Sequence, residues 1–448
     1  MPRRMRRACL ISLLALPSPA GAQAGSPAGS VPVAYLAARR QALLARLNAG
    51  VAIIKGAAEL SNDPPNSDYP QATAFRQDND FFYLTGLETK DSWLIVTAGD
   101  SALARVQLFV PPRNPGRERW TGPALGRADL AAASGIPATD IHSADSVQVF
   151  LRRALEQAGR GGAATLWIRH TEREVRLEFL RPPVLPRNVR SRDLLPVLAS
   201  LRVVKDAEEI RRLSRAAELT AEGHVAAMLF AKPGVYEYEI EAVAERVFRQ
   251  RGAERLGYPS IVGSGSNSTV LHYDQNRRQT RPGDLIVMDM GAEFGYYAAD
   301  VTRTIPVSGT FTARQRAIYE LVLGSQQAAL DAVKPGVTLR ALDAVARRYM
   351  AEHSGSLCGA EDCTRYFVHE LSHWIGMDVH DVGGLLPLAP GMVFTVEPGI
   401  YLPDEALGVR IEDDVLVTAD GYLLLSKGAP RSVADLERLM ASAGSGRP

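Results

Sequence analysis

The chain has 448 residues, of which 46% are hydrophobic and 23% are charged, and this composition is typical of a soluble globular protein. Its 51 Lys and Arg residues nearly balance its 50 Asp and Glu residues, so a formal net charge of +1 excludes strong electrostatic attraction to nucleic acid or acidic lipid. The length exceeds one ordinary hydrophobic core, so we expect two domains and small or neutral partners.

The first 24 residues have the layout of a secretory signal peptide. Four arginines open it: Arg3, Arg4, Arg6 and Arg7. An apolar run over residues 8–16 follows, and small residues end at Ala22-Gln23-Ala24. A short buried helix is the alternative, but arginines beside an apolar run favour a leader. No later apolar run reaches the roughly 18 residues of a membrane span. We expect a protein that is exported to the periplasm or secreted, without a stable membrane anchor after cleavage.

The second half of the chain contains an internal duplication. Lys232–Val235 recurs as Lys334–Val337, and a similar helical pattern follows each copy at the same offset. Pro282–Gly291 recurs as Pro390–Gly399, each copy being a turn, an apolar strand and an acid near a glycine. The shared order argues against chance similarity. Two copies exclude a solenoid and predict two α+β halves related by a pseudo-twofold axis.

Each copy places an acid at the end of its apolar strand, Asp289 in the first and Glu397 in the second. A buried acid costs free energy unless it is paired or bound to a metal. The next strand of each half supplies a second acid, Asp300 or Glu412. The expected hairpin turns are Phe294-Gly295 and Asp404-Glu405. These turns would place Asp289 opposite Asp300 and Glu397 opposite Glu412, and facing like charges require a cation between them.

Four converging carboxylates carry about four negative charges, which two divalent cations would neutralise. A histidine ligand is available from the segment between the two hairpins, residues 367–380. Oxygen ligands with one imidazole suit manganese, iron, cobalt or zinc, and the lack of thiolates argues against a structural zinc site. We therefore expect two divalent metal ions, with Mn²⁺ preferred and Zn²⁺, Co²⁺ or Fe²⁺ as alternatives.

The same segment contains the run His369-Glu370-Leu371-Ser372-His373, which matches the signature of single-zinc proteases. The longer metzincin form needs a third histidine where Val379 stands, and His380 is displaced by one position. β-Branched and aromatic residues before the run and glycines after it argue against the helix that this motif requires. A single-zinc protease remains an alternative, although it leaves the four facing acids unexplained.

Removal of the leader leaves two cysteines, Cys358 and Cys363. In an oxidising compartment they could form a local disulfide, and two free thiols are the alternative.

Several motifs together resemble the pita-bread metallopeptidases, specifically aminopeptidase P and prolidase. They are Gly263–Gly265 with Leu271–Tyr273, Asp289–Gly291, Asp300–Thr304, His369–Asp381, Thr395–Gly399 and Arg410–Asp413. They occur in the order of the family and cover most of residues 201–430. The resemblance implies five metal ligands: Asp289, Asp300, His373, Glu397 and Glu412. The four acids among them are those that the duplication identified.

Phe75–Gly86 resembles the creatinase-like domain that precedes the catalytic domain of aminopeptidases P. The fold class that the resemblance implies is an α/β N-terminal creatinase-like domain plus an α+β pita-bread catalytic domain with pseudo-twofold internal duplication. The expected boundaries are a signal peptide at 1–24, the N-terminal domain at 25–200, the catalytic domain at 201–432 and a C-terminal tail at 433–448. Trp120 resembles an aromatic residue that reaches a neighbouring subunit's site in a homo-oligomer, a dimer or tetramer, although an ordinary tryptophan is an equal alternative.

The function implied is release of an N-terminal residue that precedes proline in a peptide, by attack of a metal-bridging hydroxide. Glu397 would be both a ligand and a proton acceptor. His272 and His380 would donate hydrogen bonds to the substrate carbonyl. Arg410 shares a strand face with Glu412 and would fix the ligand network. His369, beside the ligand segment, would pack or guide substrate.

Two features depart from the family pattern. Glu370 replaces an expected small residue, and the stretch Gly383–Ala389 is short and apolar where relatives have a longer loop that often carries a substrate-contacting arginine. The preference for proline therefore rests on resemblance. A prolidase, which must recognise the free carboxylate of a dipeptide, is the closest alternative. A non-catalytic pita-bread module is another, but this chain keeps all five ligand positions.

Overall fold

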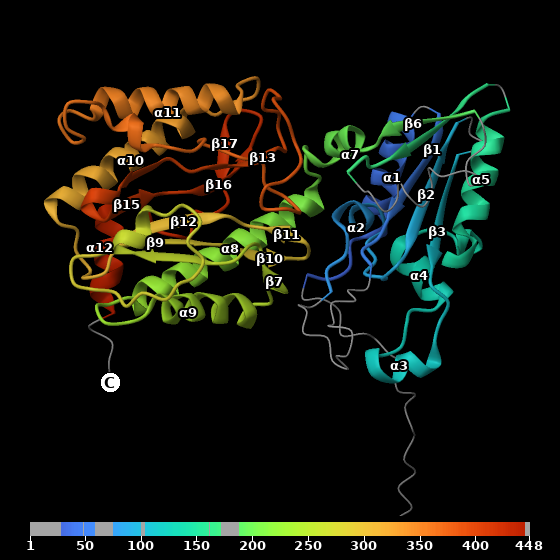
Figure 1. Ribbon diagram of the computed structural model, residues 1–448, viewed down its shortest axis with the longest axis horizontal. Coiled ribbons are helices and arrows are strands. Elements are labelled where there is room, and N and C mark those ends of the chain that lie inside the picture. Colours follow the sequence, from blue (N-terminus) through green and yellow to red (C-terminus); the bar gives the residue numbers. More distant parts are fainter. Residues whose placement is uncertain are drawn as a thin grey trace, which may run out of the picture.

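The computed structural model describes residues 28–47, 49–58, 75–99, 104–160, 162–171 and 188–443. It has two parts, an N-terminal part around one sheet and a larger C-terminal part that contains both copies of the duplication (Figure 1). The expected signal peptide lies outside the described residues. Among the helices that are described, none combines the length and the apolar character needed to cross a bilayer.

The N-terminal part is a six-stranded mixed sheet with helices on both faces. Its strand order is β4-β3-β2-β1-β5-β6. The strands are β1 (Gly50–Lys55), β2 (Trp93–Ala98), β3 (Arg105–Val110), β4 (Ile141–Ser143), β5 (Ala164–Ile168) and β6 (Val189–Asp193). The helices are α1 (Val33–Leu47), α2 (Asn79–Thr85), α3 (Pro115–Thr121), α4 (Arg127–Ser134), α5 (Val147–Ala158) and α7 (Leu195–Arg202).

Strand β1 shows why both faces of this sheet are covered. Successive side chains of a strand point to opposite faces, so a strand that is buried on both faces is apolar at every position. Ala52 and Ile54 pack in one cluster with residues of α1, whereas Val51 and Ile53 pack in another with Leu151 and its neighbours on α5. The sheet is therefore the centre of an α/β sandwich.

The C-terminal part has two halves with the same order of elements. In the first half α8 (Ala207–Phe230), α9 (Glu237–Gln250), β9 (Leu285–Met290) and β12 (Val301–Pro306) follow one another. In the second half the corresponding elements are α10 (Ala313–Asp331), α11 (Leu339–His353), β13 (Val393–Val396) and β16 (Asp413–Val417). The repeated Lys-Pro-Gly-Val segments precede α9 and α11 in the same way. The predicted duplication is thus confirmed in the order of its elements.

Shorter strands extend the two hairpins. They are β7 (Arg255–Leu256), β8 (Ile261–Ser264), β10 (Ala292–Phe294), β11 (Tyr297–Ala298), β14 (Gly399–Leu402), β15 (Leu407–Arg410) and β17 (Tyr422–Leu424). β8 and β12 pair with β9 on either side, β13 and β17 pair with β16 on either side, and β14 pairs with β15. The two hairpins carry the acids that the sequence identified.

The register predicted for the first hairpin is wrong by two positions. Asp289 lies opposite Thr302, and Asp300 precedes β12. The reason is the turn, which is centred on Gly295 and Tyr296, one residue later than expected, because Phe294 pairs with Tyr297. Both turn residues have positive φ, 58° and 74°, as a tight hairpin turn of the primed type requires.

The register predicted for the second hairpin is correct. Val396 lies opposite Asp413 and Gly399 lies opposite Arg410, so Glu397 and Glu412 occupy facing positions between these two pairs.

The prediction of a C-terminal tail at 433–448 is wrong for residues 433–442. Val433–Ser442 forms α12, which begins after the cap residue Ser432 and packs against α8 and α10. Val433, Leu436 and Met440 are buried, at a spacing that places them along one side of a helix. That spacing was present in the sequence as a helical signal.

Candidate metal centre

The two hairpins and the segment between them bring five potential metal ligands together. Asp289 lies on β9 and Asp300 just before β12. Glu397 directly follows β13 and Glu412 directly precedes β16. His373 comes from the irregular chain between α11 and β13. Each half thus contributes two acids, as the sequence predicted.

Asp300, His373 and Glu412 each offer a ligand atom, and these atoms lie within 4.8 Å of one another. His373 Nε2 is 3.3 Å from Asp300 Oδ2 and 3.5 Å from Glu397 Oε1. The fifth residue is joined through Tyr258, whose hydroxyl is 2.6 Å from Asp300 Oδ1 and also within hydrogen-bond distance of an Asp289 oxygen. The five side chains therefore form one continuous cluster.

Without a bound cation, it costs free energy to keep all of these buried carboxylates ionised. Burial raises the pKa of Glu397 to about 8 and that of Glu412 well above its usual range. Burial also acts on Asp300, but the hydrogen bond and charge of His373, together with Tyr258 and Arg410, outweigh it and lower the pKa of that carboxyl. Conversely, burial lowers the pKa of His373, while Asp300 raises it to a final value of about 9. Positive charge in the site, on His373 or on a bound cation, therefore stabilises the ionised carboxylates.

Glu412 shows that the residues fit a divalent cation. Its Oε2 accepts a hydrogen bond of 2.7 Å from the Thr302 hydroxyl. Its Oε1 is buried, and no described residue donates a hydrogen bond to it. A buried carboxylate oxygen without a donor costs free energy that a bound cation would recover. Carboxylates with one imidazole are the donors that manganese, iron, cobalt and zinc accept.

Arg410 ties the cluster to the surrounding strands. Its Nη2 donates to Asp289 Oδ2 at 2.6 Å, its Nη1 to the Tyr401 hydroxyl at 3.0 Å, and its Nε to Thr302 Oγ1 at 3.0 Å. The sequence predicted that Arg410 would lie in this network. It did not identify Tyr258, Thr302 or Tyr401 as members of the network, because a single tyrosine or threonine carries no sequence signal for a polar contact.

The three other histidines that the sequence assigned to the site, His272, His369 and His380, also lie here. The rings of His380 and His373 have centroids 4.1 Å apart. His369 Nε2 is 2.8 Å from the Tyr401 hydroxyl, and burial lowers the pKa of His369 to about 4. His272 and His380 are exposed, although partial burial of the His380 ring lowers its pKa. His272 and His380 are therefore available to an incoming ligand.

The single-zinc protease motif does not form its helix. The chain that includes His369 and His373 is irregular, and it runs beside β13. Leu371 and His373 accept backbone hydrogen bonds from Glu397 and Thr395, both 2.9 Å long. His369 is bonded to Tyr401 while His373 faces Asp300, so the two imidazoles serve different partners. The geometry of the HExxH motif is absent here.

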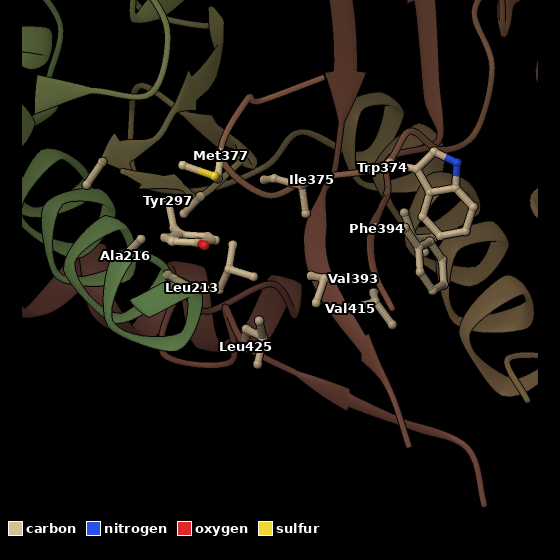
Figure 2. Packing of buried hydrophobic residues seen from close by; sticks show 14 of the residues in the cluster. Leu213, Ala216, Tyr297, Trp374, Ile375, Met377, Val393, Phe394, Val415 and Leu425 are labelled. Carbon is tan, nitrogen blue, oxygen red and sulfur yellow. The ribbon is translucent and has the colours of Figure 1, made fainter. Parts of the chain in front are cut away.

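Apolar packing holds the segment that follows His373. Trp374 forms a bridge with Phe394, and their rings meet edge to face with centroids 6.3 Å apart. Figure 2 shows Ile375 near Val393 and Met377 near Tyr297 on the other side of this segment. Farther upstream, Cys358 and Cys363 form a disulfide, the pairing that the sequence left open.

Comparisons with known proteins agree with this geometry. Residues 211–419 match the model of metallopeptidase family M24, and residues 36–161 match the aminopeptidase P N-terminal domain. The chain is 34% identical to the Xaa-Pro aminopeptidase of Escherichia coli K12 over 90% of this chain and 97% of that protein. It is 34% identical to Xaa-Pro aminopeptidase 3 of Rattus norvegicus over 85% and 78%, respectively.

Solved structures give the same result. Aminopeptidase P from E. coli, with the inhibitor Pro-Leu, superposes with a TM-score of 0.83 at 33% identity, over 93% of this chain and 100% of that chain. An aminopeptidase from Pseudomonas aeruginosa superposes with a TM-score of 0.83 at 33% identity, over 93% and 99%. Both the N-terminal and the catalytic domain are therefore shared, and so is the pita-bread fold.

Proposed function

The chain belongs to metallopeptidase family M24, with an aminopeptidase P N-terminal domain, and from this premise we propose that it releases the N-terminal residue of peptides whose second residue is proline. It is a metal-dependent aminopeptidase. The observation that carries the proposal is the largely buried cluster of four carboxylates and one histidine, in which Glu412 Oε1 has no donor from the described residues. The Xaa-Pro aminopeptidase relatives support the preference for proline.

The cofactor that we propose is a pair of divalent cations, with Mn²⁺ preferred. Their ligands would be Asp289, Asp300, His373, Glu397 and Glu412. When bound, such cations lower the pKa of a coordinated water and polarise a substrate carbonyl. Four acids match the charge of two divalent cations better than that of one.

The side chains of this site have separate roles in the reaction. Glu397 accepts the proton released by the attacking water. His272 and His380 donate hydrogen bonds to the carbonyl oxygen of the scissile bond, where negative charge develops. Burial lowers the pKa of His380 and so favours its neutral form, which still carries one N–H donor. Arg410 fixes Asp289, and His369, held by Tyr401, borders the substrate.

A prolidase needs a cation that binds the free carboxylate of a dipeptide. The stretch Gly383–Ala389, which follows the His380 segment, contains no Lys or Arg. Its apex is apolar, since Leu385 is 95% exposed. This composition supports longer peptides as substrates and disfavours a strict dipeptidase.

We also propose that the protein is exported and that it forms a homo-oligomer. The leader pattern of residues 1–24 supports export, and so does the disulfide between Cys358 and Cys363, because disulfides persist in oxidising compartments. Trp120 lies on α3, none of whose residues is buried, and it is 89% exposed. A large exposed tryptophan supports a contact with a second subunit.

The direct test starts from protein stripped of metal with a chelator. Mn²⁺, Zn²⁺, Co²⁺ and Fe²⁺ are added separately, and three substrates are compared: Ala-Pro-Ala, Ala-Pro and Ala-Ala-Ala. We expect metal-dependent release of alanine from Ala-Pro-Ala, with much slower cleavage of the other two. Cleavage of Ala-Pro alone would identify a prolidase. Equal cleavage of Ala-Ala-Ala would contradict the preference for proline.

A further inference from the structure

The catalytic histidine proposed above, His380, lies in a compact turn over residues 376–381. Gly376 N donates to Asp378 O at 3.1 Å, and Asp381 N donates to Trp374 O at 2.8 Å. These bonds close the turn. His380 itself is exposed, and its ring packs against that of His373. The placement of His380 therefore depends on what holds the turn.

Asp381, the next residue, is almost completely buried and ion-paired on both carboxylate oxygens. Its Oδ1 is 2.5 Å from Arg202 Nη2, and its Oδ2 is 3.3 Å from Lys205 Nζ. The side chains of Asp381, Arg202 and Lys205 are 1%, 3% and 1% exposed. A Cβ on Gly376 would lie 2.0 Å from Asp381 Oδ2, so the turn is built around this carboxylate.

The ion pair continues into the N-terminal domain. Arg202, the last residue of α7, also donates from Nη1 to Asp80 Oδ1 at 2.8 Å. The other oxygen of Asp80 is 2.9 Å from Arg169 Nη1. A second contact comes from Arg76, whose Nη2 donates to Met377 O at 2.8 Å. Two arginines outside the catalytic hairpins therefore hold both sides of the turn.

Stability alone does not explain this arrangement. A buried ion pair gains little over apolar residues of similar size, because removing both charges from water offsets their attraction. In some proteins such a pair fixes a single geometry, since each charge must meet its partner. In this protein the ion pairs of Asp381 fix the geometry of the turn that carries His380.

We propose that Asp381 is a positioning residue for the peptidase reaction, through which Arg202 and the N-terminal domain hold His380 in line with the scissile carbonyl. This inference rests on the proposed function. It assigns the N-terminal domain a part in catalysis. The domain would act on the rate of the chemical step because the hydrogen bond from His380 strengthens as charge develops on the carbonyl oxygen.

A double-mutant cycle tests the proposal. Asp381→Asn and His380→Ala are made singly and together, and kcat and KM are measured on Ala-Pro-Ala with saturating metal. We expect Asp381→Asn to lower kcat by roughly 10- to 100-fold with little change in KM, as small displacements of a catalytic group do. In the His380→Ala background the same change should cost less than about twofold, because non-additivity marks groups that act as a unit.

The matched control is Asp206→Asn. Asp206 also pairs across the domains, 2.8 Å from Arg39 Nη2, but no contact of this pair involves the His380 turn. Asparagine still caps α8, so this variant should keep its kcat. Asp381→Asn leaves two buried cations short of a partner, so its folding is checked by thermal melting and by metal content. If it does not fold, Arg76→Met takes its place, because Arg76 is 28% exposed and holds the same turn.

Losses that multiply in the double variant would overturn the proposal, and so would an equal loss of kcat in Asp206→Asn. A rise in KM with unchanged kcat would also overturn it. That pattern means that the residue stabilises the bound substrate and the transition state equally. The wild-type protein is assayed first. If it does not cleave Ala-Pro-Ala with any metal, the proposed function fails. If it does and the cycle is additive, only this inference fails.

Discussion

The Thr302 hydroxyl donates a hydrogen bond of 2.7 Å to Glu412 Oε2, and the amide of Glu412 donates in turn to Thr302 O at 3.0 Å. These two residues belong to opposite halves of the duplication, so the contact joins the halves at the candidate metal centre. It also leaves the second oxygen of Glu412 free to bind a cation.

Thr302→Val should therefore weaken metal binding. Valine has nearly the same shape, but it leaves Glu412 Oε2 without its donor and Arg410 Nε without its acceptor. Loss of such a partner behind a metal ligand typically costs about 10- to 100-fold in affinity. The measurement is a metal titration by calorimetry. Thr304→Val is the control, because the Thr304 hydroxyl is bonded to the backbone of Arg410 and to no acid. Equal losses in both variants would contradict the prediction.

Glu412→Gln should have opposite effects on metal binding and on stability. Glutamine removes the charge that holds the cations, so elemental analysis should find fewer ions per chain and peptidase activity should disappear. In chelated protein, burial raises the pKa of Glu412 well above its usual range, so at pH 8 its ionised form opposes folding. Removing that charge should stabilise the chelated protein, which urea unfolding at pH 8 measures. Full activity in this variant would refute the metal assignment.

Arg303→Met should destabilise the catalytic domain strongly. Arg303 and Asp413 form a completely buried pair with Nη2 and Oδ1 2.6 Å apart. Removing Arg303 leaves Asp413 paired with the more distant Arg431, whose Nη1 is 3.7 Å away, and loss of one partner from a buried pair typically costs about 3–5 kcal/mol. Urea unfolding measures the change. Arg438→Met is the control, because its pair with Asp435 is exposed, and exposed pairs contribute about 0–1 kcal/mol. Similar losses in both variants would be incompatible with this reasoning.

His224 should make the protein less stable in mild acid. It is fully buried, and burial lowers its pKa to about 4, below the usual value near 6.5. Between these values the unfolded chain binds the proton that the folded chain excludes, so the free energy of unfolding falls as the pH falls. This residue alone should cost roughly 2 kcal/mol between pH 7 and pH 5. His224→Gln should reduce that pH dependence in chelated protein, and an unchanged slope would contradict the prediction.

The sequence alone identified the acids of the site because a duplicated hairpin carries its own internal evidence. A single acid at the end of an apolar strand is already unusual. Its recurrence at the equivalent positions Asp289 and Glu397 indicates that both acids serve the same site. The same pattern, read with the family motifs, also selected His373 and Arg410. The acids needed only local periodicity and spacing, whereas the choice of His373 and the role of Arg410 followed from the resemblance to the family.

Tertiary structure alone decided the register of the first hairpin. Tyr296 has a φ of 74°, a left-handed conformation that costs free energy in any residue with a Cβ. It is held there by the N-terminal domain, where its ring stacks on Phe82 with centroids 3.7 Å apart and its hydroxyl donates to Glu88 at 2.7 Å. The ion pair between Arg202 and Asp381 likewise joins residues that are 179 positions apart in the sequence. Such contacts join domains, and local sequence patterns do not record which distant residues will meet.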